Sequence, residues 1–258
     1  MTFLDMNDLQ SDELLDSDLT TSALWVTNRN EPHLIIPPDG LPKRNQEFHG
    51  VFIPYIPYQM IKRFTCAGET VWDCFAGSGT THQVAELLGR KCISNDVMAV
   101  EPYIISADSG DFDPEQMVQL IIMHPPYWKI IQYDGDHYLS GAEDLNEFLR
   151  NFRGVVHNVV QFLEPDRMLI LVCGNIYASG EEITLGVMCK DIIRDCGFRL
   201  RSHIIKTYGE TKAGHGKAQR LHRYRMLRGG YNRFYGDNVF ILQRRPSKWR
   251  KQEIEFWR

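Results

Sequence analysis

From about residue 65 onward, short apolar runs alternate with stretches in which apolar residues recur at helical spacing. The apolar runs predict buried strands at 70–74, 91–95, 120–123 and 167–173. The amphipathic stretches predict helices at 80–88, 142–163 and 184–196. This alternation is typical of a doubly wound α/β fold with a mostly parallel sheet. Two later strands are expected at 199–206 and 238–243, joined by a long connection at 207–237 that is basic and contains several glycines.

The chain before this region has two parts. Residues 1–30 carry six Asp and Glu residues and a single basic residue, Arg29, which predicts an acidic, flexible arm or one that contacts a partner. Residues 31–64 are rich in proline and are expected to lie extended over the body, ending in a short helix at 59–64. The main domain is then expected at 65–245, followed by a basic tail at 246–258.

Charge is distributed unevenly over the 258 residues, although the net charge is only −4. From residue 199 to the end there are 16 Lys and Arg against 4 Asp and Glu, whereas the preceding residues have 13 against 29. A basic segment on an acidic body is the pattern expected of a protein that binds a polyanion. The alternative is a solvated basic tail that neutralises its own acidic domain.

Other features point to a cytoplasmic protein. No apolar run is long enough to span a membrane, and the amino terminus does not resemble a secretion signal, so no membrane association is expected. The six cysteines lie mostly in apolar segments and form no C-x-x-C pair, which favours reduced core thiols over disulfides or a metal site. We therefore expect no metal.

A glycine-rich loop follows the strand expected at 70–74. Its glycines, Gly77 and Gly79, permit positive φ angles and a close approach of backbone, and the N-terminus of the next helix favours an anionic group. The pattern is neither a phosphate-binding P-loop nor the dinucleotide motif, and a tight strand-to-helix turn is the alternative interpretation. Asp96 follows the next strand, where an acidic residue can bind ribose hydroxyls, and Asp108 could reach an adenine amino group. For either Asp alone, a turn or helix cap is the alternative.

A second loop, His124-Pro125-Pro126-Tyr127, follows the apolar run at 120–123. Proline cannot donate to a sheet ladder, so the strand must end there in a stiff loop. Tyr127 and Trp128 are expected at the lip of this loop, where a base can stack on them, although core packing is the usual role of such rings. Two loops at the carboxyl edge of one sheet predict a site for two substrates.

Together, the glycine loop 73–81 and the loop 124–127 resemble those of the S-adenosylmethionine-dependent DNA amino-methyltransferases, which modify adenine N6 or cytosine N4. The similarity extends over about residues 46–245. It implies a Rossmann-like methyltransferase sheet of seven strands with an antiparallel late strand. It also implies S-adenosylmethionine as the cofactor and double-stranded DNA with a flipped target base as the substrate. The residues expected to bind the cofactor are Asp73, Phe75, Ala76, Gly77, Ser78, Gly79, Thr80, Thr81, Asp96 and Asp108, and those expected to be catalytic are His124, Pro125, Pro126 and Tyr127.

One position departs from the family pattern. The catalytic loop of this family usually opens with Asp, Asn or Ser, whereas this chain has His124. A neutral histidine offers one acceptor nitrogen to the target amine, and a protonated one offers none. If the pKa of the His124 imidazole is near the unperturbed value of 6.5, activity would fall in mild acid. Adenine N6 is the preferred target; the alternatives are cytosine N4, an RNA or tRNA substrate, and a catalytically inactive partner subunit that binds cofactor and DNA.

The connection at 207–237 is expected to supply DNA contacts because its basic side chains are close enough to cover several phosphates. A homodimer is a further expectation that the sequence leaves open. The residues expected to contact nucleic acid are Trp128, Lys212, Lys217, Arg220, Arg223, Arg225 and Arg228.

Overall fold

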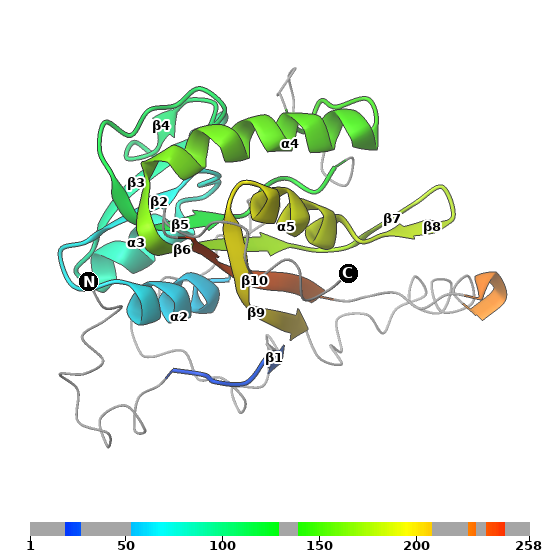
Figure 1. Ribbon diagram of the computed structural model, residues 1–258, viewed down its shortest axis with the longest axis horizontal. Coiled ribbons are helices and arrows are strands. Elements are labelled where there is room, and N and C mark those ends of the chain that lie inside the picture. Colours follow the sequence, from blue (N-terminus) through cyan, green and yellow to red (C-terminus); the bar gives the residue numbers. More distant parts are fainter. Residues whose placement is uncertain (1–18, 27–52, 129–138, 208–226, 231–235, 246–258) are drawn as a thin grey trace.

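The computed structural model describes residues 19–26, 53–128, 139–207, 227–230 and 236–245, and within them one large sheet carries helices on both faces (Figure 1). The strands of the large sheet are β1 (Leu24–Val26), β2 (Thr70–Asp73), β3 (Lys91–Asp96), β4 (Ile105–Ser106), β5 (Val118–Met123), β6 (Leu163–Cys173), β9 (Phe198–Thr207) and β10 (Gly236–Arg244). The helices are α2 (Tyr55–Phe64), α3 (Thr80–Leu87), α4 (Leu145–Val159), the 3₁₀ turn η1 (Val160–Phe162) and α5 (Leu185–Asp195). A separate hairpin is formed by β7 (Ile176–Ala178) and β8 (Glu181–Ile183).

The sheet is doubly wound and mostly parallel, as the sequence predicts. Its strand order is β1-β9-β10-β6-β5-β2-β3-β4, and β10 runs antiparallel to both of its neighbours, which confirms the antiparallel late strand. The strand order reverses direction between β2 and β5. In such sheets the ligand crevice lies beyond the carboxyl ends of the strands at this reversal. Within the described residues the large sheet has eight strands instead of the expected seven, and the short β1 and β4 lie at its two edges.

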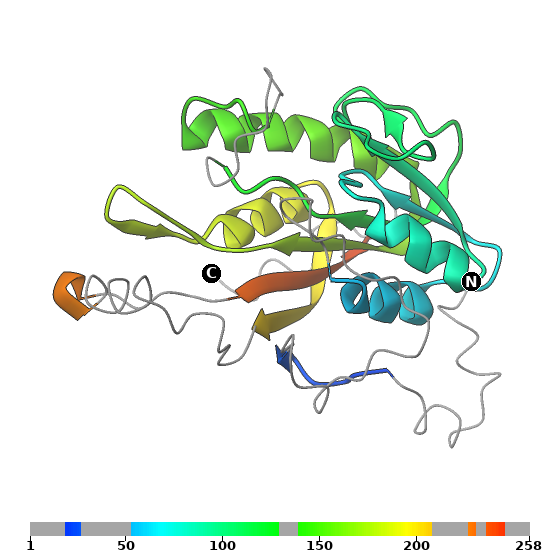
Figure 2. The same cartoon turned by 180° about the vertical axis from the view of Figure 1, so that it is seen from behind.

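Alternate residues of the central strands face two different helical layers. Trp72 of β2 packs in a cluster with Phe148 and Phe152 of α4 and with residues of α5. Its neighbour Val71 packs in a second cluster with residues of α2 and α3. Figure 2 shows the same two layers from behind, with α4 and α5 on one side of the sheet and α2 and α3 on the other. The strands are buried on both faces, which explains their nearly continuous apolar runs.

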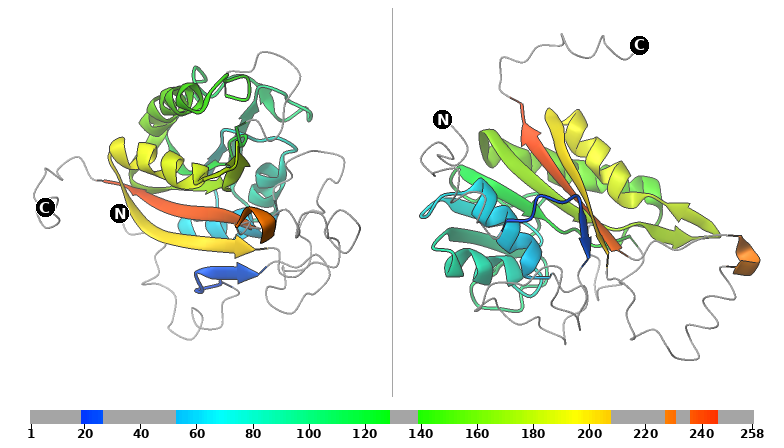
Figure 3. Two further views of the ribbon diagram at one scale, coloured as in Figure 1. Left: turned by 90° about the vertical axis from the view of Figure 1, so that its right-hand side faces the viewer. Right: turned by 90° about the horizontal axis from the view of Figure 1, so that it is seen from below.

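The front of the chain differs from the sequence expectation. Residues 24–26, within the predicted flexible arm, form β1 and pair in parallel with β9 at the sheet edge (Figure 3). Trp25 is fully buried and packs edge-on against Tyr55, with ring centroids 5.7 Å apart. Thr20 receives a 2.6 Å hydrogen bond from Arg63 on its carbonyl oxygen. This part of the arm is therefore bound to the body, because a single large aromatic side chain fills a place in the core.

Two helix boundaries also differ. The helix expected at 59–64 begins at Tyr55, because Pro54 occupies the N-cap and Pro57 lies in the first turn, where proline needs no hydrogen-bond partner. The helix expected at 142–163 is shorter: α4 starts after Asp144, whose side chain accepts a 2.8 Å hydrogen bond from the Glu147 N–H. None of the helices that the structure describes is long and apolar enough to cross a membrane.

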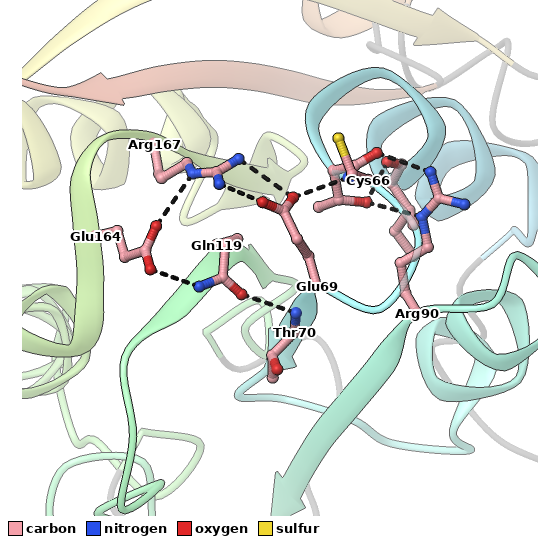
Figure 4. Close-up of polar contacts among 9 residues, drawn as sticks. Cys66, Glu69, Thr70, Arg90, Gln119, Glu164 and Arg167 are labelled. Carbon is pink, nitrogen blue, oxygen red and sulfur yellow. Dashed lines mark hydrogen bonds and ion pairs between the residues drawn. The ribbon is translucent and has the colours of Figure 1, made fainter. Parts of the chain in front are cut away.

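A polar network closes the amino edge of the sheet, opposite the candidate site (Figure 4). Arg167 of β6 lies between Glu69 and Glu164, with hydrogen bonds to both carboxylates. Gln119 of β5 accepts a 2.8 Å bond from the Thr70 N–H and donates a 2.7 Å bond to Glu164. The network therefore joins β2, β5 and β6 at their beginnings, which fixes the spacing of the strands that end at the site.

We expect Arg167→Leu to lower the free energy of unfolding by about 1.5–3 kcal/mol, because it leaves the partly buried Glu69 carboxylate without its main charged donor. Denaturant unfolding of the full chain measures this. The matched control is Arg153→Leu, which removes an exposed pair with Asp195 and should change the stability by about 0–1 kcal/mol. Equal losses in the two variants would contradict a structural role for the network.

Candidate active site

The glycine loop lies at the carboxyl end of β2 and leads directly into α3, as predicted. Gly77 and Gly79 have φ angles of 50° and 77°, and Gly79 is the N-cap of α3. The Ala76 N–H donates to the carbonyl oxygen of Asn95 at 3.1 Å, which ties the loop to the end of β3. The positive φ angles explain why glycine is required at these two positions.

Two acidic side chains flank this loop. Asp73 is buried at the end of β2, and burial raises the pKa of its carboxyl to about 6, an effect to which the neighbouring Asp96 carboxylate adds. Asp96 accepts a 2.8 Å hydrogen bond from the Gly77 N–H and a 2.9 Å bond from the Met98 N–H. The loop is therefore fixed by the Asp96 carboxylate, and each of its oxygens keeps a further lone pair that can accept from a hydroxyl group.

Tyr103 is a loop residue that sequence reasoning missed. A Cβ added at Gly79 would lie 2.5 Å from the Tyr103 hydroxyl oxygen, so the phenol packs directly on this glycine. The hydroxyl accepts a 2.9 Å bond from the Gln83 side chain, and the ring lies 4.4 Å from the His82 ring. Only the tertiary structure reveals this contact, because Tyr103 is separated from the loop by the whole of α3 and β3.

Asp108 lies in a turn that packs beneath the glycine loop. Its side chain accepts a 2.7 Å hydrogen bond from the Gly110 N–H, which is the turn role that the sequence left open. The adjacent Ser109 hydroxyl donates to the carbonyl oxygen of Cys74. Asp108 is therefore placed close to the glycine loop, and the adjacent Ser109 holds that loop through Cys74.

The loop 124–127 extends the carboxyl end of β5, next to β2. The Tyr127 hydroxyl donates to Asp237 Oδ1 at 2.9 Å and lies 3.2 Å from Nε2 of His124. The Tyr127 ring packs against Gly174 at the end of β6, where an added Cβ would lie 2.8 Å from its Cε2 atom. The hydroxyl and the ring of Tyr127 are thus both fixed by neighbouring strands.

Two residues beneath this loop were not identified from the sequence. Asp237 is the second residue of β10, and the amine of Lys206 near the end of β9 lies 2.5 Å from its Oδ2 atom. Burial alone would raise the pKa of the Asp237 carboxyl, but the Lys206 ammonium, together with His124 and the Tyr127 hydrogen bond, outweighs it, and the pKa is lowered. Only 1% of the Lys206 side chain is exposed, so the ion pair belongs to the interior of the protein.

His124 is held neutral by its surroundings. Burial lowers the pKa of its imidazole to about 4; Asp237 opposes this change and Lys206 reinforces it. The expected acid sensitivity near pH 6.5 is therefore corrected: within the described structure, the ring keeps its acceptor nitrogen through the whole neutral and mildly acidic range.

The predicted nucleic-acid contacts are only partly described. Trp128 is partly buried, packs against the core cluster around α4 and donates a 3.2 Å hydrogen bond to the carbonyl oxygen of Ala142. Arg228 is exposed. The other five residues lie outside the described residues: Lys212, Lys217, Arg220, Arg223 and Arg225. In the described ranges no group of three or more His, Cys, Asp or Glu side chains is placed to hold a metal ion.

Comparison with known proteins agrees with the family resemblance. A family model described as DNA methylase matches residues 18–105 and 118–255, which is most of the chain. No curated protein matches the chain at a significant level.

Several solved structures are similar to this one. TrmN from Thermus thermophilus is 16% identical over 75% of this chain and 49% of its own, with a TM-score of 0.46. The N-methyltransferase NodS from Bradyrhizobium japonicum, in complex with S-adenosyl-L-homocysteine, is 11% identical over 74% of this chain and 85% of its own, with a TM-score of 0.46. A protein provisionally assigned as a DNA modification methylase, also from Thermus thermophilus, is 24% identical over 57% of this chain and 53% of its own, with a TM-score of 0.36. The chain thus spans about half the length of the first and third of these proteins.

We expect Gly77→Val and Gly79→Val to weaken S-adenosylmethionine binding at least tenfold. Valine strains a backbone with positive φ, and at position 79 it also displaces the Tyr103 phenol. Calorimetric titration of the folded variants measures the change. Gly89→Val is the matched control, because Gly89 also has a positive φ of 71° but follows α3, and a Cβ there would contact nothing within 4 Å. Equal affinity in all four proteins would refute the cofactor assignment.

We expect the His124 imidazole to titrate with a midpoint near pH 4, about two and a half units below an unperturbed histidine, because protonation would charge a partly buried ring next to Lys206. NMR titration of the imidazole signals measures the midpoint, and the spectrum of His124→Asn identifies which signal belongs to this ring. A midpoint at or above 6.5 would contradict the burial argument.

Proposed function

This chain belongs to the DNA methylase family whose model it matches, and on that premise we propose that it transfers a methyl group from S-adenosylmethionine to the exocyclic N6 amino group of adenine in DNA. The observation that carries the proposal is the meeting of two loops at the reversal of strand order. The glycine loop after β2 and the loop 124–127 after β5 leave adjacent parallel strands at the same edge. A cofactor on one loop and a base on the other would therefore face each other across that edge.

The cofactor side has the chemistry that S-adenosylmethionine requires. This cofactor carries a carboxylate, an ammonium group and a sulfonium, and it supplies an electrophilic methyl group. The N-terminus of α3 favours the carboxylate, and the buried Asp73 would be held ionised by a nearby cationic group. Asp96, already bonded to the Gly77 N–H, has lone pairs left for ribose hydroxyls.

The base side would act mainly by positioning. Neutral His124 offers one acceptor nitrogen to the target amine, and the Pro125 carbonyl oxygen offers a second. Hydrogen bonds to these acceptors would hold the amino group and aim its lone pair at the methyl group, which is how orientation contributes to the rate. The target base would flip out of the duplex at a cost of a few kcal/mol and stack on the Tyr127 ring, beside Pro126.

One sequence feature suggests cytosine instead. Trp128 resembles a residue that often follows the catalytic loop in cytosine enzymes. Its indole N–H here donates to Ala142, and its ring packs against the core cluster, so it serves as an anchor for the loop. The preference for adenine is part of our proposal.

Double-stranded DNA is the proposed substrate, and the basic connection 207–237 the proposed contact with its phosphates. The strands that it joins end and begin next to the candidate site, β9 at Thr207 and β10 at Gly236. Its basic residues would therefore be tethered to the edge of the sheet at which the flipped base enters.

Parallel incubations of the purified full chain with methyl-labelled S-adenosylmethionine and either duplex DNA or tRNA, followed by chromatography of the nucleosides, test the proposal. We expect labelled N6-methyladenine, and its loss in His124→Ala with cofactor affinity retained. The matched control is Asp195→Asn, which alters an exposed ion pair far from the site and should leave the rate unchanged. Label in N4-methylcytosine would overturn the adenine assignment, and label in tRNA alone would overturn the DNA assignment. Cofactor binding without any transfer would instead indicate a non-catalytic subunit.

A further inference from the structure

Four side chains from three separate elements form one continuous chain of polar contacts beneath the base side of the site. The Lys206 amine lies 2.5 Å from Asp237 Oδ2, and Asp237 Oδ1 accepts a 2.9 Å bond from the Tyr127 hydroxyl. The same hydroxyl oxygen lies 3.2 Å from Nε2 of His124. Lys206 comes from β9, Asp237 from β10, and the other two from the loop after β5.

The direction of each hydrogen bond follows from the charge at the buried end of this chain. Burial opposes ionisation of Asp237, but the Lys206 ammonium lowers the pKa of the carboxyl below its ordinary value, so the group is a carboxylate. A carboxylate can only accept hydrogen bonds. The single hydroxyl proton of Tyr127 is therefore directed to Asp237, and the hydroxyl oxygen is left to act as an acceptor toward His124.

That acceptor determines the tautomer of His124. A neutral imidazole carries its proton on one of its two nitrogens, and the hydrogen bond made by one nitrogen decides which. Since Nε2 faces an oxygen whose proton points away, Nε2 carries the hydrogen and donates it to Tyr127. Nδ1 is then the acceptor nitrogen of the ring.

We propose that Lys206, Asp237 and the Tyr127 hydroxyl are positioning residues that hold His124 in the tautomer with its proton on Nε2, so that Nδ1 can accept a hydrogen bond from the target amine. This inference rests on the proposed function for its purpose, although the tautomer itself can be measured without any activity. It gives the Lys206–Asp237 pair a role in catalysis that acts through another residue.

The role is specific to a chain with histidine at this position. An Asp, Asn or Ser side chain has an oxygen that can accept regardless of how its neighbours orient their protons. An imidazole in the wrong tautomer would present an N–H to the target N–H, and neither could accept. A fixed direction of hydrogen bonding is therefore necessary here, and a charged residue at the buried end is what supplies it.

The test replaces Asp237 by its nearly isosteric amide. In Asp237→Asn, Lys206 retains the amide oxygen, so the amide NH₂ faces Tyr127 and donates to the hydroxyl oxygen. The hydroxyl proton must then point to His124, which becomes the tautomer with its proton on Nδ1. We expect ¹⁵N NMR of histidine-labelled full-length protein, with the His124 signal identified through His124→Asn, to show Nε2–H in the wild type and Nδ1–H in Asp237→Asn.

Tyr127→Phe provides a second variant that keeps the ring for stacking and removes only the hydroxyl. We expect its His124 signal to show a mixture of both tautomers, because Nε2 loses its acceptor. Asp195→Asn, which removes an exposed carboxylate, should leave the spectrum unchanged. Single-turnover methyl transfer at saturating cofactor should fall roughly 10- to 100-fold in Asp237→Asn, the range typical when an outer hydrogen-bond partner is lost, while the affinity for cofactor stays the same.

Three results would overturn the proposal: Nδ1–H in the wild type, an unchanged tautomer in both Asp237→Asn and Tyr127→Phe, or an inverted tautomer with an unchanged rate. If Asp237→Asn does not fold, as judged by its thermal transition, the second of these results is judged on Tyr127→Phe alone. The first needs only the wild-type spectrum. Failure of the proposed function looks different, because a protein without methyl transfer would still show the wild-type tautomer and its inversion.

Discussion

The buried ion pair between Lys206 and Asp237 is the contact on which the geometry of the candidate active site depends. Either charge alone would be costly to bury, but the two are buried as a pair where the end of β9 meets the beginning of β10. Since β10 is antiparallel, it begins at the edge where the parallel strands end. Asp237, a residue 110 positions after Tyr127, thereby reaches the loop 124–127 and fixes the Tyr127 hydroxyl.

Much of the fold could be predicted because the central strands are buried on both faces. Their apolar runs are visible in the sequence, and the predicted strands at 70–74, 91–95 and 120–123 correspond to β2, β3 and β5 within two residues at either end. β1 could not be predicted, since it lies in an acidic segment and its pairing with β9 joins residues far apart in the chain. Proline content misled the prediction for α2, because proline breaks a helix in its interior but fits its first turn.

The candidate site, like the fold, could be predicted from the sequence only in part. The glycine loop and the loop 124–127 are contiguous in the sequence and follow predicted strands, so their meeting at one edge could be predicted. Tyr103, Lys206 and Asp237 have roles that exist only through contacts across the fold, and their residue types alone carry no such signal. The neutrality of His124 likewise depends on burial, which no local pattern at this position encodes.

The two sides of the site also differ in charge, which gives the histidine a physical reason to be there. The side on which we propose that the cofactor binds has two carboxylates, Asp73 and Asp96, suited to a cationic ligand. On the base side, Lys206 neutralises Asp237, and His124 is neutral at pH 7. An aspartate at 124 would put a second carboxylate next to the Tyr127 hydroxyl, close to Asp237, and repulsion between them would raise the pKa of one. Histidine avoids that conflict, provided that Tyr127 holds it in the accepting tautomer.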